Sequence, residues 1–304
     1  RVIEPLRNMG VKIVSNNNQL PLDISSTSLK QIDYYIPIPS AQVKSCIMLA
    51  SLGCKGISRL KGCINTRDHL ERMLSYLCSD GLKCSKNFIE INPSKIRLNA
   101  FDIKIPGDAS SASFFIGLAS LLKGSELIIE NLLLNKHRIG FIKTLQGMGA
   151  NIVITESRYH FNEKIGTVTV KGNRILSPCN VASSSIPSMI DEIPILSLLC
   201  SYIDGTSTIE GLNELKYKES NRYECIIHIL EAMGVDVAPY KLDGIIIKGK
   251  NKLYNTSKLN CYNDHRLAMM ISIAQILSVR KVHYDECIDI SFPSFKSLMR
   301  KVLK

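Results

Sequence analysis

The chain has 304 residues and a formal net charge of +11, so it is long enough for two domains and basic enough to favour anionic partners. Hydrophobic residues make up 45% of it and charged residues only 21%, a balance that excludes a disordered basic tail. Aromatic residues reach 6% and Trp is absent, which argues against a surface that stacks single-stranded nucleic acid.

The ten cysteines are scattered, and no two of them form a Cys-x-x-Cys pair. Since no signal segment is visible, we expect reduced, structural thiols in a cytoplasmic protein and no metal ion. The apolar run at 193–203 is interrupted by Pro194 and two serines and is too short to span a membrane. The sequence starts at Arg1 within an amphipathic pattern, so we expect it to begin inside a longer polypeptide.

In chain order, the predicted elements repeat at an interval of about 70 residues. Each repeat opens a helix at an Ile-Pro dipeptide, continues through a short β-rich run to a second amphipathic helix, and ends in strands. The helix openings are at 38–44, 105–111 and 186–192. The second helices are predicted to end at C-cap glycines: Gly10, Gly81, Gly149 and Gly234. A last, partial repeat starts at 264–266 and ends in a helix at 295–302.

The helix openings could form a shared anion site. Proline fits the first turn of a helix, and free N–H groups with the positive end of the dipole remain available to an anion. Three such ends from equivalent repeats could converge on one place. The alternative is plain helix capping, and the sequence leaves both interpretations open.

Four segments gather charged residues at predicted helix starts: 65–71, 186–194, 214–222 and 261–269. Carboxylates, lysine and arginine together suit a site that binds small anions and moves protons. Dipole compensation or a solvated surface would explain each segment alone. The sequence has neither GxxxxGK[ST] nor GxGxxG, which argues against P-loop and Rossmann nucleotide binding, and His69 and His265 lack the spacing of a zinc site.

Six motifs resemble those of the EPSP synthase family in sequence and in order. They are Pro-Ser-Ala-Gln-Val-Lys-Ser (39–45), Thr-Arg-Asp-His-Leu-Glu-Arg-Met-Leu (66–74), Pro-Gly-Asp-Ala-Ser-Ser (106–111), Asp-Glu-Ile-Pro-Ile-Leu (191–196), Lys-Glu-Ser-Asn-Arg (218–222) and Asp-His-Arg (264–266). The resemblance implies an α/β fold, the two-domain inside-out barrel of enolpyruvyl transferases built of βαβαββ units, here N-terminally truncated. It implies an incomplete domain at 1–104, a second domain at 105–304 and an active site in the cleft between them.

The resemblance also implies residue roles. Ser40, Ala41 and Gln42 correspond to the segment that binds shikimate 3-phosphate, and Arg67 to a phosphate contact. Asp191 and Glu219 correspond to the two acid/base residues, with Glu219 placed by His265. Lys218 corresponds to a shikimate contact, and Arg222 and Arg266 to a clamp on phosphoenolpyruvate.

The implied reaction transfers the enolpyruvyl group of phosphoenolpyruvate to the 5-hydroxyl of shikimate 3-phosphate, without metal or cofactor, in a protein that is monomeric when complete and binds neither nucleic acid nor membrane. The family's upstream Arg and Lys-Ser contacts are absent, so we expect the chain alone to be essentially inactive. Asn221 replaces the family's usual Asp, which leaves a non-catalytic, anion-binding paralogue as an alternative. A less favoured alternative is UDP-N-acetylglucosamine enolpyruvyl transferase, which lacks the Lys-Glu-Ser-Arg motif.

Overall fold

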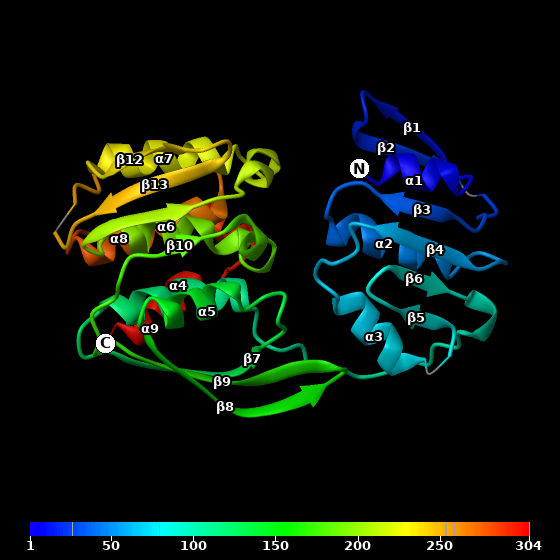
Figure 1. Cartoon of the computed structure of the whole chain (residues 1–304), viewed down its shortest axis with the longest axis horizontal. Helices are drawn as coiled ribbons and strands as arrows, with labels where there is room; N and C mark the ends of the chain where they lie inside the picture. The colour runs from blue at the N-terminus through cyan, green and yellow to red at the C-terminus, as the bar shows by residue number, and fades with distance from the viewer. Residues whose placement is uncertain (26, 79, 253, 258, 304) are drawn as a thin grey trace. The chain divides into compact units, whose positions relative to one another are not determined.

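A computed structural model describes every residue except 26, 79, 253, 258 and 304, and the chain divides into two compact units (Figure 1). Unit 1 contains residues 1–104 together with 159–163, and unit 2 contains residues 105–158 and 164–304. Each unit has its own buried apolar cluster. The short segment 159–163, which the sequence analysis places with 105–304, is thus grouped with unit 1.

Unit 1 is built on a four-stranded sheet with the order β3-β4-β6-β5 and a separate hairpin, β1-β2. In chain order its elements are α1 (Ile3–Asn8), β1 (Lys12–Asn16), β2 (Gln19–Ser25), β3 (Asp33–Ile36), α2 (Ala41–Ser51), β4 (Ser58–Gly62), α3 (His69–Leu77), β5 (Leu82–Cys84), β6 (Phe88–Ile91) and the 3₁₀ turn η1 (Pro93–Lys95). The pair β3/β4 is parallel, while β4/β6 and β5/β6 are antiparallel. Parallel strands need a crossover, and α2 supplies it.

The segment 159–163 packs against α3. The ring of Phe161 lies 4.4 Å from that of Tyr76 between centroids, and Glu163 Oε1 lies 2.5 Å from His69 Nδ1. The Arg72 guanidinium donates to the backbone oxygen of Asn162 at 2.8 Å. Unit 1 therefore takes an aromatic and an ionic contact from a segment that is remote from it in sequence.

Unit 2 contains two further sheets, β7-β9-β8 and β10-β11-β13-β12. The elements after residue 104 are α4 (Ala109–Leu121), β7 (Glu126–Leu133), α5 (Gly140–Gly147), β8 (Asn151–His160), β9 (Glu163–Lys171), β10 (Asn180–Val181), the 3₁₀ turns η2 (Ser183–Ser188) and η3 (Ile190–Glu192), α6 (Ile193–Ser201), β11 (Gly205–Ile209), η4 (Asn213–Tyr217), α7 (Arg222–Met233), β12 (Asp236–Tyr240), β13 (Gly244–Gly249), α8 (His265–Leu277), η5 (Glu286–Ile290) and α9 (Phe295–Val302).

The three larger sheets follow one βαβαββ plan, which confirms the repeat. When the strands of each sheet are numbered from the first one in the chain, β3-β4-β6-β5 and β10-β11-β13-β12 have the same order, and the first pair is parallel in both. In the third sheet, a parallel bridge between Gly107 and Leu132 stands where the first strand would pair with β7. Right-handed crossovers between parallel strands explain why each helix returns to its own sheet.

The helices α4, α6 and α8 form the core of unit 2. All nine residues of α6 are buried, and α4 is buried over most of its length. A helix that is apolar on every face is stable only when it is enclosed by others, and these three helices contact one another. A Cβ on Gly117 of α4 would lie 3.1 Å from Leu199 Cδ1, so this glycine allows α4 and α6 to approach closely. The starts of α6 and α8 carry candidate site residues.

One predicted helix opening is wrong in detail. Residues 186–192 form 3₁₀ turns rather than the first turn of a helix, and α6 begins only at Ile193. Pro187 lacks an N–H, while Pro194 fits the first turn of α6, so the helix starts between the two prolines. Asp191 and Glu192 therefore precede the helix. The four predicted C-cap glycines all have positive φ, and Gly234 directly caps α7 at φ 83°.

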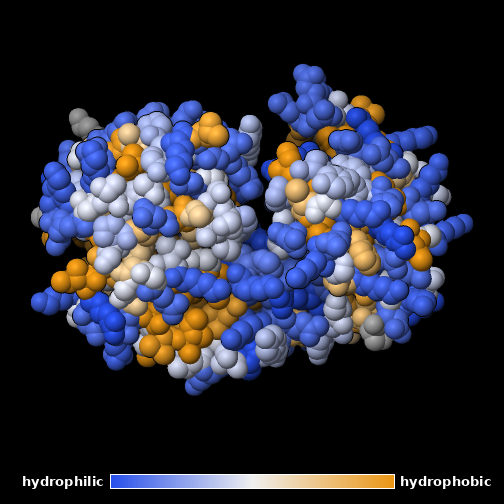
Figure 2. Space-filling model, in the orientation of Figure 1, coloured by the Kyte–Doolittle hydropathy of each residue, from blue (hydrophilic) through white to orange (hydrophobic). Residues whose placement is uncertain are grey.

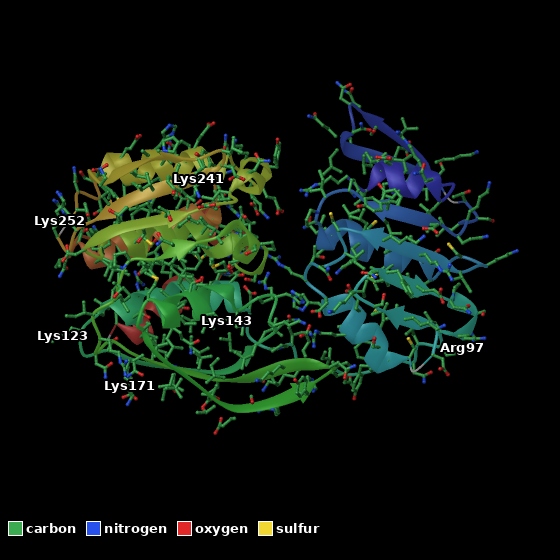
Figure 3. The ribbon with its side chains drawn as sticks, in the orientation of Figure 1. Arg97, Lys123, Lys143, Lys171, Lys241 and Lys252 are labelled. Carbon is green, nitrogen blue, oxygen red and sulfur yellow. The ribbon has the colours of Figure 1, made fainter. Side chains whose placement is uncertain are left out.

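The surface carries dispersed charge and some apolar area. The labelled basic side chains in Figure 3 come from separate elements and loops: Arg97, Lys123, Lys143, Lys171, Lys241 and Lys252. Apolar surface lies over the β7-β9-β8 sheet (Figure 2), whose exposed residues include Ile128 and Val153. Among the helices of the described residues, none has the length and apolar character needed to cross a membrane.

Candidate active site

The start of α8 is organised by Asp264, which is fully buried. As N-cap residue, its Oδ1 accepts the backbone N–H groups of Arg266 at 2.9 Å and Leu267 at 3.4 Å. Its Oδ2 accepts from Arg222 Nε at 2.7 Å. Burial alone would raise the pKa of Asp264, but the hydrogen bonds and charge of Arg222 outweigh it and hold the pKa below its ordinary value. The Asp-His-Arg motif thus contains a structural anion as well as two candidate substrate contacts.

The guanidinium of Arg222, at the first position of α7, joins three carboxylates. It contacts Asp264 as described, donates from Nη2 to Glu219 Oε2 at 2.5 Å, and places Nη1 3.5 Å from Asp191 Oδ1. Only 1% of its side chain is exposed. A buried cation needs anionic partners to offset its lost hydration, so this arginine fixes the two predicted acid/base residues relative to each other.

Asn221 caps α7. Its Oδ1 accepts the backbone N–H of Glu224 at 3.4 Å, as the carboxylate of an Asp would at the same position. The departure from the family's usual Asp therefore keeps the cap and removes one negative charge beside Arg222.

Asp191 is nearly buried and is surrounded by cations. Lys218 Nζ lies 3.7 Å from its Oδ1, and Arg138 Nη1 lies 3.9 Å from its Oδ2. Arg266 Nη1 lies 3.5 Å from its backbone oxygen. Together with Arg222, three basic side chains thus converge on the carboxylate, and Arg266 contacts the backbone oxygen of the same residue.

Glu219 and His265 differ in environment. The side chain of Glu219 is 51% exposed, so one carboxylate oxygen is held by Arg222 while the group as a whole reaches solvent. His265 is 9% exposed, and burial together with the charges of Arg266 and Arg222 lowers its pKa. The negative charge of Glu219 acts on His265 in the opposite direction, which is consistent with the two being neighbours.

Three residues beside the site have no role assigned from the sequence: Arg138, Asp108 and Glu192. Arg138 Nη2 donates to Asp108 Oδ1 at 2.7 Å and to Ser110 Oγ at 2.6 Å, which ties the start of α4 to Asp191. Burial raises the pKa of Glu192, and the charge of Arg138 opposes this only in part. Asp108 and Glu192 lie in the motifs at 106–111 and 191–196, whereas Arg138 lies in a polar run without helical periodicity, so no sequence signal distinguishes it.

The predicted residues of unit 1 form a separate group. Ser40 caps α2 through Oγ, which accepts Val43 N at 3.3 Å, and Ala41 and Gln42 occupy the first turn. Lys44, which is buried, donates from Nζ to the backbone oxygen of Arg67 at 2.9 Å. The structure therefore connects the α2 start with Arg67 inside unit 1.

The Thr-Arg-Asp-His segment leads into α3 without a side-chain cap. Asp and Thr are residue types that commonly cap helices, but α3 begins at His69 with no side-chain cap from Asp68. The Asp68 carboxylate instead pairs with Arg72, one turn later, at 2.9 Å.

The chain is similar to known proteins over almost its whole length. The family model of EPSP synthase (3-phosphoshikimate 1-carboxyvinyltransferase) matches residues 1–299. The 3-phosphoshikimate 1-carboxyvinyltransferases of Thermodesulfovibrio yellowstonii and Clostridium tetani are 39% and 37% identical to it, covering 100% and 99% of this chain and 71% and 69% of theirs. The EPSP synthase of Acinetobacter baumannii superposes with a TM-score of 0.86 at 33% identity, over 99% of this chain and 69% of that one. The enolpyruvyl transferase NikO of Streptomyces tendae shares the fold, with a TM-score of 0.67 at 16% identity over 91% of this chain and 64% of that one.

Proposed function

The chain belongs to the EPSP synthase family, and from that premise we propose that unit 2 supplies the acid–base residues and part of the anion site for enolpyruvyl transfer. The substrates of the family are shikimate 3-phosphate and phosphoenolpyruvate, and the products are EPSP and phosphate. The names of the matched relatives do not favour the UDP-N-acetylglucosamine transferase alternative.

Asp191 is proposed as the base for the 5-hydroxyl of shikimate 3-phosphate. As the hydroxyl oxygen attacks C2 of phosphoenolpyruvate, its proton passes to the carboxylate and a C–O bond forms. Lys218 and Arg222 lie within 3.7 Å of this carboxylate and orient it. A general base acts over hydrogen-bond distances, so its orientation matters as much as its proton affinity.

Glu219 is proposed as the residue that exchanges a proton with C3 of phosphoenolpyruvate. C3 gains a proton when the tetrahedral intermediate forms, and loses one when the C2–O bond to phosphate breaks and the enol double bond returns. An exposed carboxyl held at one oxygen by Arg222 can carry a proton in both directions.

Arg266 and Lys218 are proposed to bind the anionic groups of the substrates. Arg266 is half-buried at the start of α8 and offers the planar fork that suits a carboxylate or phosphate. Arg222 is buried; it adds positive charge to the site and holds the carboxylates of Asp191 and Glu219 in place. In unit 1, Ser40, Ala41, Gln42 and Arg67 are proposed to bind shikimate 3-phosphate.

The observation that carries this proposal is the junction of Asp191, Glu219 and Asp264 at one buried guanidinium. The test measures phosphate release from both substrates, with the chain alone and joined in one polypeptide to the N-terminal segment of the Clostridium tetani enzyme. We expect kcat/KM of the chain alone to be at least ~10³-fold lower, because about three charge-assisted contacts of the upstream segment are lost.

In the joined enzyme, Asp191→Asn should lower kcat by ~10²–10⁴-fold with little change in shikimate 3-phosphate binding. A kcat within a few fold of wild type would remove Asp191 as the base. Lack of activity in the joined wild-type enzyme would favour a non-catalytic paralogue.

A further inference from the structure

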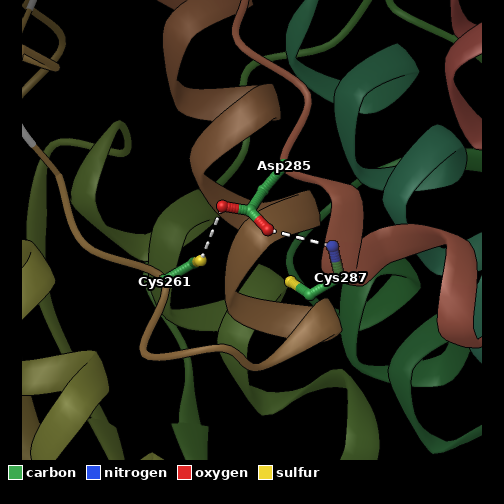
Figure 4. Close-up of side chains that lie close together, drawn as sticks. All are labelled: Cys261, Asp285 and Cys287. Carbon is green, nitrogen blue, oxygen red and sulfur yellow. Dashed lines mark hydrogen bonds between the residues drawn. The ribbon is translucent and has the colours of Figure 1, made fainter.

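Two thiols and one carboxylate lie together in unit 2, outside the candidate active site. The Sγ atoms of Cys261 and Cys287 and a carboxylate oxygen of Asp285 are all within 4.8 Å of one another (Figure 4). Cys261 precedes α8, Asp285 is the N-cap of η5, and Cys287 lies within η5. Among the described residues, it is the one group of three or more His, Cys, Asp or Glu side chains whose ligand atoms lie close enough together to hold a metal ion.

The carboxylate of Asp285 is already oriented toward both cysteines. Its Oδ1 accepts the backbone N–H of Cys287 at 2.9 Å, and its Oδ2 accepts the thiol of Cys261 at 3.3 Å (Figure 4). A ligand that is held by hydrogen bonds before a cation arrives needs little reorganisation to bind it.

The spacing of the three groups approaches that of tetrahedral zinc. Zn–S bonds of about 2.3 Å and Zn–O bonds of about 2.1 Å place two sulfurs about 3.8 Å apart, and a sulfur and an oxygen about 3.6 Å apart. The distance of 3.3 Å from Cys261 Sγ to Asp285 Oδ2 is close to the ~3.6 Å expected for sulfur and oxygen on one zinc ion. All ligand atoms lie within 4.8 Å of one another, so side-chain movements of about 1 Å or less would bring them to zinc-binding distances.

The cluster is accessible from a cavity of about 280 Å³, which is lined by Cys261, Asp285 and His283 among others. Cys287 is buried. The cavity provides a path of entry for an ion, and it brings His283 to the same space as two of the ligands. A fourth ligand would complete four-coordination: a water molecule, or the His283 imidazole after its side chain moves closer to the other three.

We propose that Cys261, Asp285 and Cys287 form a binding site for one Zn²⁺ ion or another thiophilic divalent cation, completed by His283 or water. On binding, both thiols become thiolates and release two protons to solvent. Burial raises the pKa of both thiols, so they carry these protons in the metal-free chain. The proposal departs from the expectation of no metal ion that was drawn from the sequence.

The bound ion would act as a structural brace. The backbone oxygen of Cys261 accepts the N–H of Asp264 at 2.9 Å, so Cys261 belongs to the turn that presents the N-cap of α8. An ion bound to Cys261 and Cys287 would join this turn to η5 and restrict the position of Asp264. Its expected effect is on stability, because its ligands lie in the turn before α8 and in η5 rather than among the proposed acid–base residues.

The test uses Co²⁺ as a spectroscopic substitute for Zn²⁺, titrated into the reduced, untagged chain. We expect a thiolate-to-cobalt charge-transfer band in the near ultraviolet, the visible spectrum of a tetrahedral ion, and loss of both on addition of Zn²⁺. Cys261→Ser and Cys287→Ser should each lower the charge-transfer intensity by about half and weaken binding by at least ~10-fold, and Asp285→Asn should weaken binding by ~10–100-fold.

Cys46→Ser is the matched control, because Cys46 is also partly buried and lies in α2, outside the cluster. It should retain the full spectrum. Zn²⁺ should also raise the melting temperature of wild type and Cys46→Ser, but not of Cys261→Ser, whose fold is checked by circular dichroism. Absence of the charge-transfer band, or its full intensity in either cluster variant, would overturn the proposal. These measurements do not depend on enzyme activity, so they stand apart from the test of the proposed function.

Discussion

Lys44 in unit 1 and Arg222 in unit 2 are both buried cations near helix starts, yet their surroundings differ. Each has only 1% of its side chain exposed. Lys44 pairs with one nearly buried carboxylate, Glu71, and donates to two backbone oxygens. Arg222 contacts carboxylates that range from fully buried Asp264 to half-exposed Glu219.

The helix dipole disfavours a cation at a helix start, so each position depends on its anions. The partners of Lys44 all lie within unit 1, and its hydrogen bonds connect α2 to the segment around Arg67. At Arg222 one of the paired carboxylates, Glu219, is half-exposed, and in the proposed function this group exchanges a proton with the substrate. The comparison suggests that a buried ion pair serves stability when its partners are all internal and serves function when one partner faces solvent.

The largest expected effect is the loss of stability on removing either cation. Lys44→Met and Arg222→Met should each lower the free energy of unfolding by about 3–5 kcal/mol, because a buried carboxylate is left without its cation. Denaturant unfolding followed by circular dichroism gives the total loss, and hydrogen exchange of peptides from α2 and α7 assigns it to a unit. A loss below about 1 kcal/mol at either position would contradict the view of a desolvated pair.

Removing the anion as well separates the two sites. Lys44→Met with Glu71→Leu should recover the free energy of unfolding to within about 1 kcal/mol of wild type, because an apolar pair replaces a buried ionic one. Arg222→Met with Asp264→Leu should remain lower by about 1 kcal/mol or more, since Asp264 also caps α8. In the joined enzyme, only the second double variant should be inactive. Equal activity of the two doubles would remove the functional distinction.

Two carboxyl groups beside Arg222 and Arg138 should respond to pH in opposite directions. The pKa of Asp264 is lowered in the folded state, so its contribution to stability is present above about pH 4 and is lost as pH falls. The pKa of Glu192 is raised, so its contribution is present at acidic pH and is lost as pH rises through the raised value. The melting temperature of Glu192→Gln relative to wild type should therefore rise from pH 4 to about pH 7.

Asp264→Asn is the counterpart in this series. The advantage of wild type over this variant should shrink as the pH is lowered below about 4. Melting curves of either variant that run parallel to wild type across this range would show that the group does not titrate differently on folding.

The smallest expected effect concerns the cap of α7. Asn221→Ala should lower the free energy of unfolding by about 1 kcal/mol, because the N–H of Glu224 loses its acceptor. Asn221→Asp is the control and should unfold like wild type, since a carboxylate caps as well. If Asn221→Ala leaves the free energy of unfolding unchanged, the capping hydrogen bond of Asn221 does not contribute to stability.

The repeated βαβαββ plan could be predicted because it depends on local signals. Proline at the helix openings and glycine after the second helices are set by backbone geometry within a few residues. The prediction failed at 186–192, where two prolines seven residues apart, Pro187 and Pro194, compete to start the helix.

The contacts of the site could be predicted only in part. Asp191, Glu219 and Arg222 were found through motifs, but the bridge that joins them depends on burial and on contacts between distant segments. Arg138 lies 53 residues before Asp191 in sequence, and no period or motif relates the two. The same holds for Cys261 and Cys287, which lie far outside the spacing of a Cys-x-x-Cys pair and meet only because α8 folds back toward η5.

Because residues 159–163 pack against α3, the gene segment that encodes residues 1–104 does not encode the whole of unit 1. Unit 1 is discontinuous in sequence: it needs residues encoded more than fifty codons downstream of its own main segment. An expression product that stops at Lys104 would leave His69 without Glu163 and Tyr76 without Phe161. Gene splitting, exon shuffling or recombination at the 104/105 border would therefore not transfer unit 1 as an intact module.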